Sequence, residues 1–343
     1  MFDTIKLYPW WRTTISDIED ILSTLKVGKA LTLCHSAGNR PIRYAVYGDK
    51  PDFSRHANYS SACGARDIRH FANRAGKPPV VMLIGAVHGQ ELEGVAALYN
   101  LILLLETGVD GMGNHPDFYT KVADCNMRLI IIPILNIDGR VRCRPDSMLD
   151  MTDKELRYWG QGTWRDGSLC GWPECKSYHP ILERAGFLGA YFNDDGVNLM
   201  HDSFFSPYAA ETATLLRLAE DEAPDIIIQL HGGSNSTNIL LRTDYVSLEA
   251  NEQLTELAER CAALTRLAGL PTAIDKVKSG KPAPSFNLAS ALHHSCGALS
   301  AVYESNEGLK SANAFAAEDI LKLHYLLFES VFSYSIELRS RKY

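Results

Sequence analysis

A short group of possible metal ligands follows an apolar run in the first third of the chain. The run Val80–Val87 leads directly into His88, Gly89, Gln90 and Glu91. Zinc accepts imidazole nitrogen and carboxylate oxygen, and a catalytic zinc site uses three protein ligands so that one position stays open for water. Two ligands at a strand-to-helix turn can converge on one ion, and Gly89 permits the tight backbone path. His88 and Glu91 are therefore predicted as two of three ligands.

The third ligand has to be chosen by context, because the sequence holds eleven histidines. His231 ends the apolar segment Asp225–Leu230 and precedes two glycines, an arrangement that directs a side chain into a cleft. Other histidines do not end such an apolar segment before two glycines. They are predicted to lie on an outer strand (His35), in polar loops (His56, His70 and His115) or on a helix (His293 and His294). A His-x-x-Glu pattern alone occurs by chance in many proteins. The prediction of one zinc ion held by His88, Glu91 and His231 therefore depends on the combination, and Glu93 is assigned to a helix face.

A glutamate at the end of the last apolar segment, Leu299–Tyr303, is a candidate general base. Zinc lowers the pKa of a bound water, and a nearby carboxylate can take the proton as hydroxide attacks an amide carbonyl. Glu304 fits that role because it ends the predicted strand. Glu307 is the alternative, but it lies beyond the strand beside Gly308.

Three arginines at every second position follow the turn Asp138-Gly139. A guanidinium group can bind a carboxylate bidentately or stabilise a developing oxyanion. We predict a catalytic role for Arg142 and Arg144 and a substrate contact for Arg140. The alternative is a solvated basic loop.

The elements that must position these residues alternate along the chain. The predicted strands are Leu31–Cys34, Ile42–Tyr47, Val80–Val87, Arg128–Leu135, Asp225–Leu230 and Leu299–Tyr303. The predicted helices are Ile15–Leu25, Glu91–Leu105, Glu211–Glu220, Leu248–Leu267 and a C-terminal helix from about Ala312. This alternation predicts an α/β sandwich with a largely parallel or mixed sheet, whose ligands gather beyond the strand ends. We expect one domain over residues 1–343, with an N-terminal helical extension (1–30) and a long loop insertion near the active site (140–192).

Composition limits the possible partners. Hydrophobic residues at 46% and charged residues at 22% are typical of an ordinary globular protein. A formal net charge of −7 argues against a nucleic-acid surface. The apolar runs are far shorter than the roughly 20 residues needed to cross a bilayer. We expect no membrane contact and a cytoplasmic location. The sequence does not indicate an oligomeric state.

The eight cysteines are spread over the whole chain, unlike the dense framework of a small secreted domain. Most are therefore predicted to be buried thiols. The alternative is that Cys170 and Cys175 form a local disulfide or half of a metal site. No second cysteine pair accompanies them, which argues against a metal site.

Several segments also carry a resemblance to a known family. Gly85–Glu91 resembles a first zinc motif, Gln229–His231 a later zinc histidine, and Val302–Glu304 a strand that bears a catalytic glutamate. Asn136–Gly139 is similar to an Asn-Pro-Asp-Gly turn, and Gly196–Leu199 to a Gly-Val-Asp-Leu segment. These are features of the zinc carboxypeptidases, the funnelin metallocarboxypeptidases, with looser similarity to deacylases of the succinylglutamate desuccinylase and aspartoacylase type. The resemblance implies an α/β/α domain with a twisted mixed sheet of about eight strands.

Two places depart from the family pattern. Asn198 stands where the family has an aspartate that orients the first zinc histidine, so a charged partner becomes neutral. Met200 and His201 stand where an Asn-Arg pair usually grips the terminal carboxylate of the substrate. A histidine offers at most one donor there and is only partly charged near neutral pH. We predict that Asn198 and His201 contribute to substrate binding.

These features predict a zinc metallopeptidase of carboxypeptidase type that hydrolyses amide bonds of peptides, including unusual ones such as cell-wall fragments. The alternative is a zinc-dependent deacylase of N-acyl amino acids. A third possibility is a catalytically silent binding protein on the same fold. The expected partner is accordingly a peptide or an N-acyl amino acid.

Overall fold

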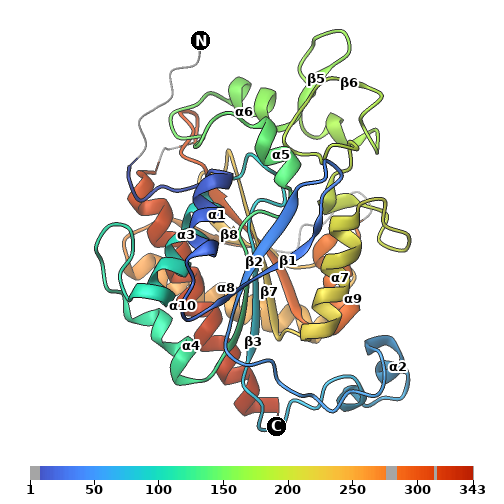
Figure 1. The fold of residues 1–343 in the computed structure, drawn as a ribbon, viewed down its shortest axis with the longest axis vertical. Helices are drawn as coiled ribbons and strands as arrows, with labels where there is room; N and C mark the ends of the chain where they lie inside the picture. Colours follow the sequence, from blue (N-terminus) through green and yellow to red (C-terminus); the bar gives the residue numbers. More distant parts are fainter. Residues whose placement is uncertain (1–7, 276–283, 313–314, 343) are drawn as a thin grey trace.

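A mixed sheet forms the centre of the computed structural model, which describes residues 8–275, 284–312 and 315–342 (Figure 1). Within these ranges its eight strands are β1 (Lys29–His35), β2 (Pro41–Tyr47), β3 (Val80–Ile84), β4 (Arg128–Ile132), β7 (Ile226–Gly233), β8 (Asn238–Leu240), β9 (Thr272–Ile274) and β10 (Leu299–Asn306). Their order across the sheet is β1-β2-β4-β3-β7-β10-β8-β9. Neighbours among the central strands β4, β3, β7 and β10 are parallel, so their carboxyl ends meet at one edge. The predicted mixed α/β sheet is confirmed.

Helices cover both faces of this sheet (Figure 1). The helices of the described ranges are α1 (Ile15–Ser23), α2 (Tyr59–Gly64), α3 (Glu93–Thr107), α4 (Thr120–Asp124), α5 (Ile137–Arg142), α6 (Asp153–Gly160), α7 (Ala210–Glu222), α8 (Leu248–Leu267), α9 (Leu288–Cys296) and α10 (Ala317–Lys342), of which α5 and α6 lie beyond the sheet. On one face α3 packs against α1 and α10, and α10 against α8, whereas α7 and α9 pack together on the other. Across the described ranges, none of these helices is both long and apolar enough to cross a membrane.

The two central apolar runs form strands that are buried on both faces. Every residue of β3 and β4 is buried, as is typical of parallel strands between two helix layers. Both strands end earlier than their predicted ends, Val87 and Leu135. β4 stops before Pro133, which has no N–H to donate to a neighbouring strand. β3 stops before Ala86, whose φ of 44° turns the chain toward His88.

The segment 140–192, predicted as a long loop, holds regular structure of its own. After α5 and α6 it contains the antiparallel pair β5 (Gly162–Trp164) and β6 (Ala185–Leu188) and the short 3-10 helix η3 (Glu174–Lys176). It lies at the top of Figure 1, beyond the carboxyl edge of the sheet. A small apolar cluster of Cys170, Cys175, Ile181 and Phe192 stabilises it. Cys170 and Cys175 are free thiols, and five of the eight cysteines are buried, as predicted.

The N-terminal extension is packed into the main core. α1 begins at a capping box in which Thr14 and Asp17 bond reciprocally, and it buries Ile18 and Leu22. The main apolar core then extends from Trp10 to residue 338 of α10. Residues 1–7 of the predicted extension lie outside the described ranges.

Candidate metal centre

The three predicted metal ligands converge at the carboxyl edge of the sheet. His88 follows β3, and His231 lies near the end of the adjacent strand β7. One ligand atom from each of His88, Glu91 and His231 lies within 4.8 Å of the others. His88 Nδ1 is 2.7 Å from Glu91 Oε1, and His231 Nδ1 is 2.9 Å from Glu91 Oε2. All three side chains are buried.

Backbone contacts fix the turn that carries His88 and Glu91. The N–H of Glu91 donates to the carbonyl of His88 (3.2 Å), and the N–H of Gly89 donates to the carbonyl of Ala190 (2.8 Å). A Cβ atom at Gly89 would lie 2.2 Å from the backbone nitrogen of Arg140. Glycine is therefore required where this turn meets the start of α5.

His88 is held on its other nitrogen and on its ring face. Its Nε2 lies 3.3 Å from Asn198 Oδ1, which also accepts a hydrogen bond from the backbone N–H of Met200 (2.9 Å). An amide oxygen only accepts, so Nε2 carries the ring proton and the lone pair of Nδ1 faces Glu91. The ring of Tyr191 stacks on His88 with centroids 3.6 Å apart and an interplanar angle of 5°.

Asn198 does not take the substrate-binding place predicted for it. It is 2% exposed and lies behind His88, outside the lining of the adjacent cavity. The structure instead makes it a neutral orienting partner of the histidine.

The electrostatics of the cluster fit a bound divalent cation. Burial raises the pKa of Glu91, but His88 and His231 outweigh it and lower that pKa to about 2, so the carboxylate is ionised. Burial lowers the pKa of His88, which favours the neutral form that a ligand requires. For His231 the Glu91 carboxylate outweighs burial and raises the pKa.

The hydrogen bonding of the cluster is also incomplete. Glu91 Oε2 and His231 Nε2 are buried without a hydrogen-bond partner in the described residues, although Oε2 is close to His231 Nδ1. A buried ionised carboxylate between two imidazoles is unfavourable unless it is compensated. Two imidazoles and one carboxylate are a donor set that zinc accepts, so these residues fit a zinc ion.

Glu304 lies beside the cluster on the next strand. In the parallel pairing of β10 with β7, Glu304 is in register with His231, and its carboxylate lines the cavity. Asn235 Nδ2 donates to Glu304 Oε2 at 3.2 Å. Burial and the nearby Glu91 carboxylate raise the pKa of Glu304, while His231 acts in the opposite direction.

Glu307, the alternative base, is sealed from the cavity. It is fully buried, and both of its carboxyl oxygens lack hydrogen-bond partners in the described residues. Glu93 lies close by, because a Cβ atom at Gly232 would meet both carboxyl side chains. Burial raises the pKa of Glu307 well above the usual range, which favours the neutral acid.

An open cavity of about 1040 Å³ borders the metal ligands and Glu304. Its apolar wall consists of Leu156, Ile239, Leu241, Ile274 and Val302. Its polar lining includes Gln90, Arg157, Lys176, His201 and Asn235. Apolar walls with a few convergent polar groups are characteristic of ligand sites, and this volume is at the upper end of their usual range.

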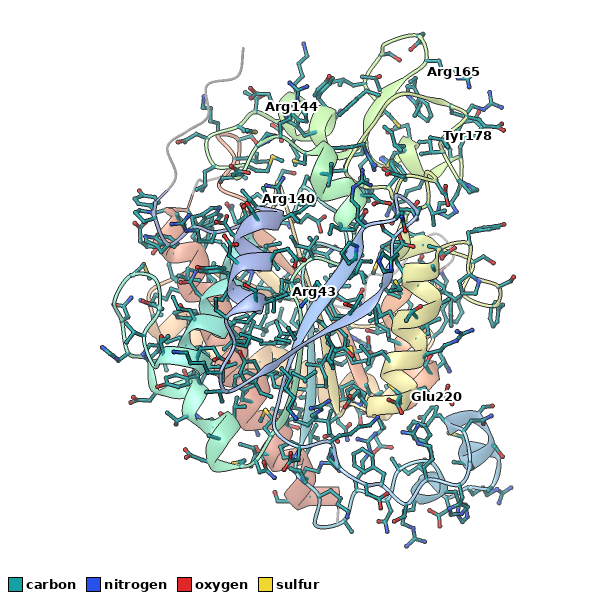
Figure 2. All side chains as sticks on the ribbon, viewed as in Figure 1. Arg43, Arg140, Arg144, Arg165, Tyr178 and Glu220 are labelled. Carbon is teal, nitrogen blue, oxygen red and sulfur yellow. The ribbon has the colours of Figure 1, made fainter. Side chains whose placement is uncertain are left out.

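The three predicted arginines do not enter this cavity, and the structure gives two of them a structural role. Arg140 is 4% exposed, donates to the carbonyls of Thr13 and Cys143, and pairs with Asp146 at 2.6 Å. Arg140 and Arg144 are labelled in Figure 2 above the sheet, around α5. Their assignment to substrate and catalysis is therefore corrected: spacing placed them near the cleft, but neither lines it.

Arg142 makes its contacts within the insertion and with the residues that follow it. It pairs with Asp194 and donates to the carbonyls of Leu188 and Phe192, which ties α5 to the end of the insertion. Arg144 is exposed. The predicted catalytic roles of Arg142 and Arg144 thus have no support in the geometry.

Sequence reasoning found His201 but missed other residues of the site. His201 lines the cavity, and its contact with substrate stays a prediction. Lys176 and Tyr191 come from parts of the insertion without a periodic pattern, and Arg157 comes from α6, whose start is marked by the capping box of Thr152 and Glu155. The signal that could have found Asn235 is its position just after His231-Gly232-Gly233, where the chain leaves a central strand.

The mixed α/β sheet with a ligand cluster and a large cavity at its carboxyl edge is an arrangement that fits a metal-dependent enzyme. The chain belongs to the zinc carboxypeptidase family, whose match covers residues 8–342. The family assignment made from the motifs is confirmed.

Solved structures show the same fold at low sequence identity. A metallo-carboxypeptidase from Burkholderia cenocepacia is similar with a TM-score of 0.60 and 13% identity, over 94% of this chain and 68% of that one. Carboxypeptidase A from Helicoverpa armigera has a TM-score of 0.57 and 12% identity, over 99% and 77%. Bovine thrombin-activatable fibrinolysis inhibitor has a TM-score of 0.55 and 10% identity, over 96% and 99%. A search among curated proteins finds no match.

Proposed function

We propose that this protein hydrolyses amide bonds of peptides, with one zinc ion held by His88, Glu91 and His231 and with Glu304 as general base. The observation that carries the proposal is the register of β10 on β7, which sets Glu304 directly beside His231 at the mouth of the cavity. A base and a metal cluster on adjacent parallel strands can act on the same bound amide.

The residues of the chain divide the chemistry between them. When bound, zinc lowers the pKa of a coordinated water and polarises a carbonyl oxygen. Glu304 takes a proton from the attacking water and later delivers it to the leaving nitrogen. Its raised pKa makes it a stronger base than an ordinary carboxylate, and Asn235 holds one of its oxygens in place.

The substrate assignment rests on the cavity and the family. The cavity is large enough for a short peptide, and the similar structures are named as carboxypeptidases. The altered pair Met200-His201 leaves the deacylation of N-acyl amino acids as the second candidate.

Product analysis tests this proposal. Zinc-loaded protein and its Glu304→Gln variant are incubated with peptides bearing free or amidated C-termini and with N-acyl amino acids, and the products are identified by mass spectrometry. Release of free C-terminal amino acids by the parent alone supports the peptidase. Release of acyl acids alone identifies the deacylase, and tight binding without turnover identifies a binding protein.

A further inference from the structure

Lys176 is a cation that the insertion holds inside the active-site cavity. It ends η3, whose neighbouring Cys175 is buried in the apolar cluster of the insertion. The N–H of Lys176 donates to the carbonyl of Pro173 (2.9 Å), and that of Cys175 to the carbonyl of Gly171 (2.8 Å). The backbone at this position is therefore fixed, and the side chain lines the same cavity as His88, Glu91 and Glu304.

The ammonium group of Lys176 is oriented by a neutral partner. Its Nζ lies 3.0 Å from His201 Nε2. An ammonium only donates, so Nε2 accepts and the ring proton is on Nδ1, which lies 3.4 Å from Ser285 Oγ. Burial and the positive charge of Lys176 lower the pKa of His201 to about 3, so the ring stays neutral. Trp172, 56% exposed, lies beneath Nζ with its ring centroid 5.4 Å away.

The charge of Lys176 is not neutralised by the part of the chain that the structure describes. No described carboxylate lies within ion-pair distance of its Nζ, whereas Arg140 and Arg142 of the same insertion are each paired with an aspartate. Glu91 and Glu304 act on Lys176 only from farther away. Lys176 is exposed where it lines the open cavity, and desolvation by the surrounding protein atoms still lowers its pKa. An anion bound in the cavity would therefore stabilise the charged ammonium.

We propose that Lys176, oriented by His201, binds a carboxylate group of the substrate and so selects which peptides are cut. This inference rests on the proposed function, because it takes the ligand of the cavity to be a peptide. In a peptide the carboxylate has two sources, the free C-terminus and an acidic side chain. The ammonium offers a charge and further N–H donors to either.

Arg157 also lines the cavity and makes no ion pair within the described residues, but no side-chain hydrogen bond orients it, whereas Lys176 Nζ lies 3.0 Å from His201 Nε2. An oriented donor loses less freedom on binding than a free one. Lys176 is therefore the specificity residue, and Arg157 is outside the proposal.

Binding measured in an inactive background tests Lys176 separately from catalysis. Zinc-loaded Glu304→Gln protein is titrated, by NMR or calorimetry, with acetyl-Ala-Ala-Ala, with its C-terminal amide, and with acetyl-Ala-Glu-Ala amide. The same titrations are made after adding Lys176→Met, and after adding Lys154→Met as the matched control. Lys154 is exposed on α6 and does not line the cavity.

We expect Lys176→Met to weaken binding of a carboxylate probe by roughly tenfold or more, and to leave binding of the neutral amide within twofold. Selective loss for acetyl-Ala-Ala-Ala identifies the C-terminus as the source, and selective loss for the glutamate peptide identifies the side chain. The proposal is overturned if neutral and charged probes weaken equally, or if no charged probe binds more tightly than its neutral counterpart.

The two proposals fail in different ways. Carboxylate-dependent binding through Lys176 in a parent protein that cleaves no peptide removes the proposed function and leaves this binding site. Cleavage of peptides without any dependence on Lys176 removes this inference alone.

Discussion

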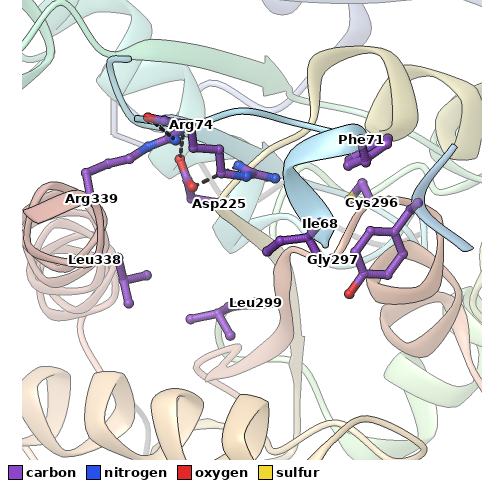
Figure 3. Close-up of a pocket in the computed structure, with 10 residues that line it drawn as sticks. Ile68, Phe71, Arg74, Asp225, Cys296, Gly297, Leu299, Leu338 and Arg339 are labelled. Atoms are coloured by element: carbon purple, nitrogen blue, oxygen red, sulfur yellow. Dashed lines mark hydrogen bonds and ion pairs between the residues drawn. The ribbon is translucent and has the colours of Figure 1, made fainter. Parts of the chain in front are cut away.

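The two edges of the central sheet differ in whether their charged residues are paired. At the amino edge Asp225, which precedes β7, pairs with Arg74 at 2.9 Å and with Arg339 of α10 at 2.7 Å (Figure 3). It also accepts a hydrogen bond from the N–H of Val80. Arg74 donates further to the carbonyl of Ala223. The cavity beside this network measures only about 50 Å³.

At the carboxyl edge, polar and charged groups near the ends of the same strands have no hydrogen-bond or ion-pair partner among the described residues. Glu91 Oε2 and His231 Nε2 lack hydrogen-bond partners, and Lys176 lacks an anion, beside a cavity of about 1040 Å³. Removing one partner of a fully paired buried charge destabilises the fold, whereas charge left unpaired beside a large cavity is available for binding and chemistry.

Glu304→Gln should lower kcat/KM by about 10²–10⁴-fold, because it removes the base and preserves the shape of the side chain. The zinc content per chain should not change. Glu307→Gln is the matched control, because it replaces a buried acid that is already neutral. Steady-state kinetics on the peptide identified by product analysis provide the measurement. Equal losses in the two variants would remove Glu304 from its assigned role.

Asp225→Asn should lower the free energy of unfolding by about 3 kcal/mol, because two buried arginines lose their shared carboxylate. The kcat of the folded protein should stay unchanged, since the substitution lies at the opposite edge from the metal ligands. Urea unfolding and kinetics measure the two effects. The control Asp221→Asn breaks a solvent-exposed pair with Lys50 and should change stability by less than about 1 kcal/mol. A fall in kcat without unfolding would contradict the separation of the two edges.

Arg142→Leu should lower the free energy of unfolding by about 2 kcal/mol, because Asp194 and two backbone carbonyls lose a charged donor. Arg144→Ala, at an exposed position, should change neither stability nor kcat. Unfolding curves and kinetics of both variants measure this. A kcat of Arg144→Ala reduced by about 10²-fold would return that residue to the catalytic role expected from sequence.

Glu256→Gln tests the same contrast at the surface. The hydrogen bond from Arg341, with smaller contributions from Tyr334 and Arg260, lowers the pKa of Glu256 to about 2. Because the folded-state pKa is below that of the unfolded chain, the stabilisation is present near neutral pH and is lost as the pH falls toward about 2.

The side chain of Glu256 is 35% exposed, so solvent screens the pair. The variant should be only about 0.5 kcal/mol less stable near neutral pH, and as stable as the parent near pH 2, in unfolding curves at both values. A deficit as large as that of Asp225→Asn would show that burial does not separate the two networks.

The cluster of the three candidate ligands could be predicted because each residue is set by a local pattern. His88 and His231 directly follow apolar runs that form central strands, and parallel strands bring their carboxyl ends together. The boundaries of α8 were likewise predicted correctly, since its period is unbroken.

The rest of the site depends on packing that no short pattern encodes. Lys176 reaches the cavity only because the insertion folds around its own small apolar core. Arg142 donates its hydrogen bonds to backbone carbonyls some 50 residues later in the chain, so it does not reach the cavity. Strands β8 and β9, three residues each, were not predicted because they are too short to show alternation. For Asn198 the predicted substrate contact was wrong, whereas its contact with His88 is the one that the family resemblance implied.

Zinc content and hydrolysis measured on the same preparations test whether His88, Glu91 and His231 form a catalytic metal centre. We expect one zinc ion per chain, loss of hydrolysis when a chelator removes it, and recovery on adding zinc back. His231→Ala should bind little zinc and recover no activity, while the exposed control His35→Ala should behave as the parent. Undiminished hydrolysis by metal-free protein, or full zinc binding by His231→Ala, would contradict the assignment of His88, Glu91 and His231 as a catalytic metal centre.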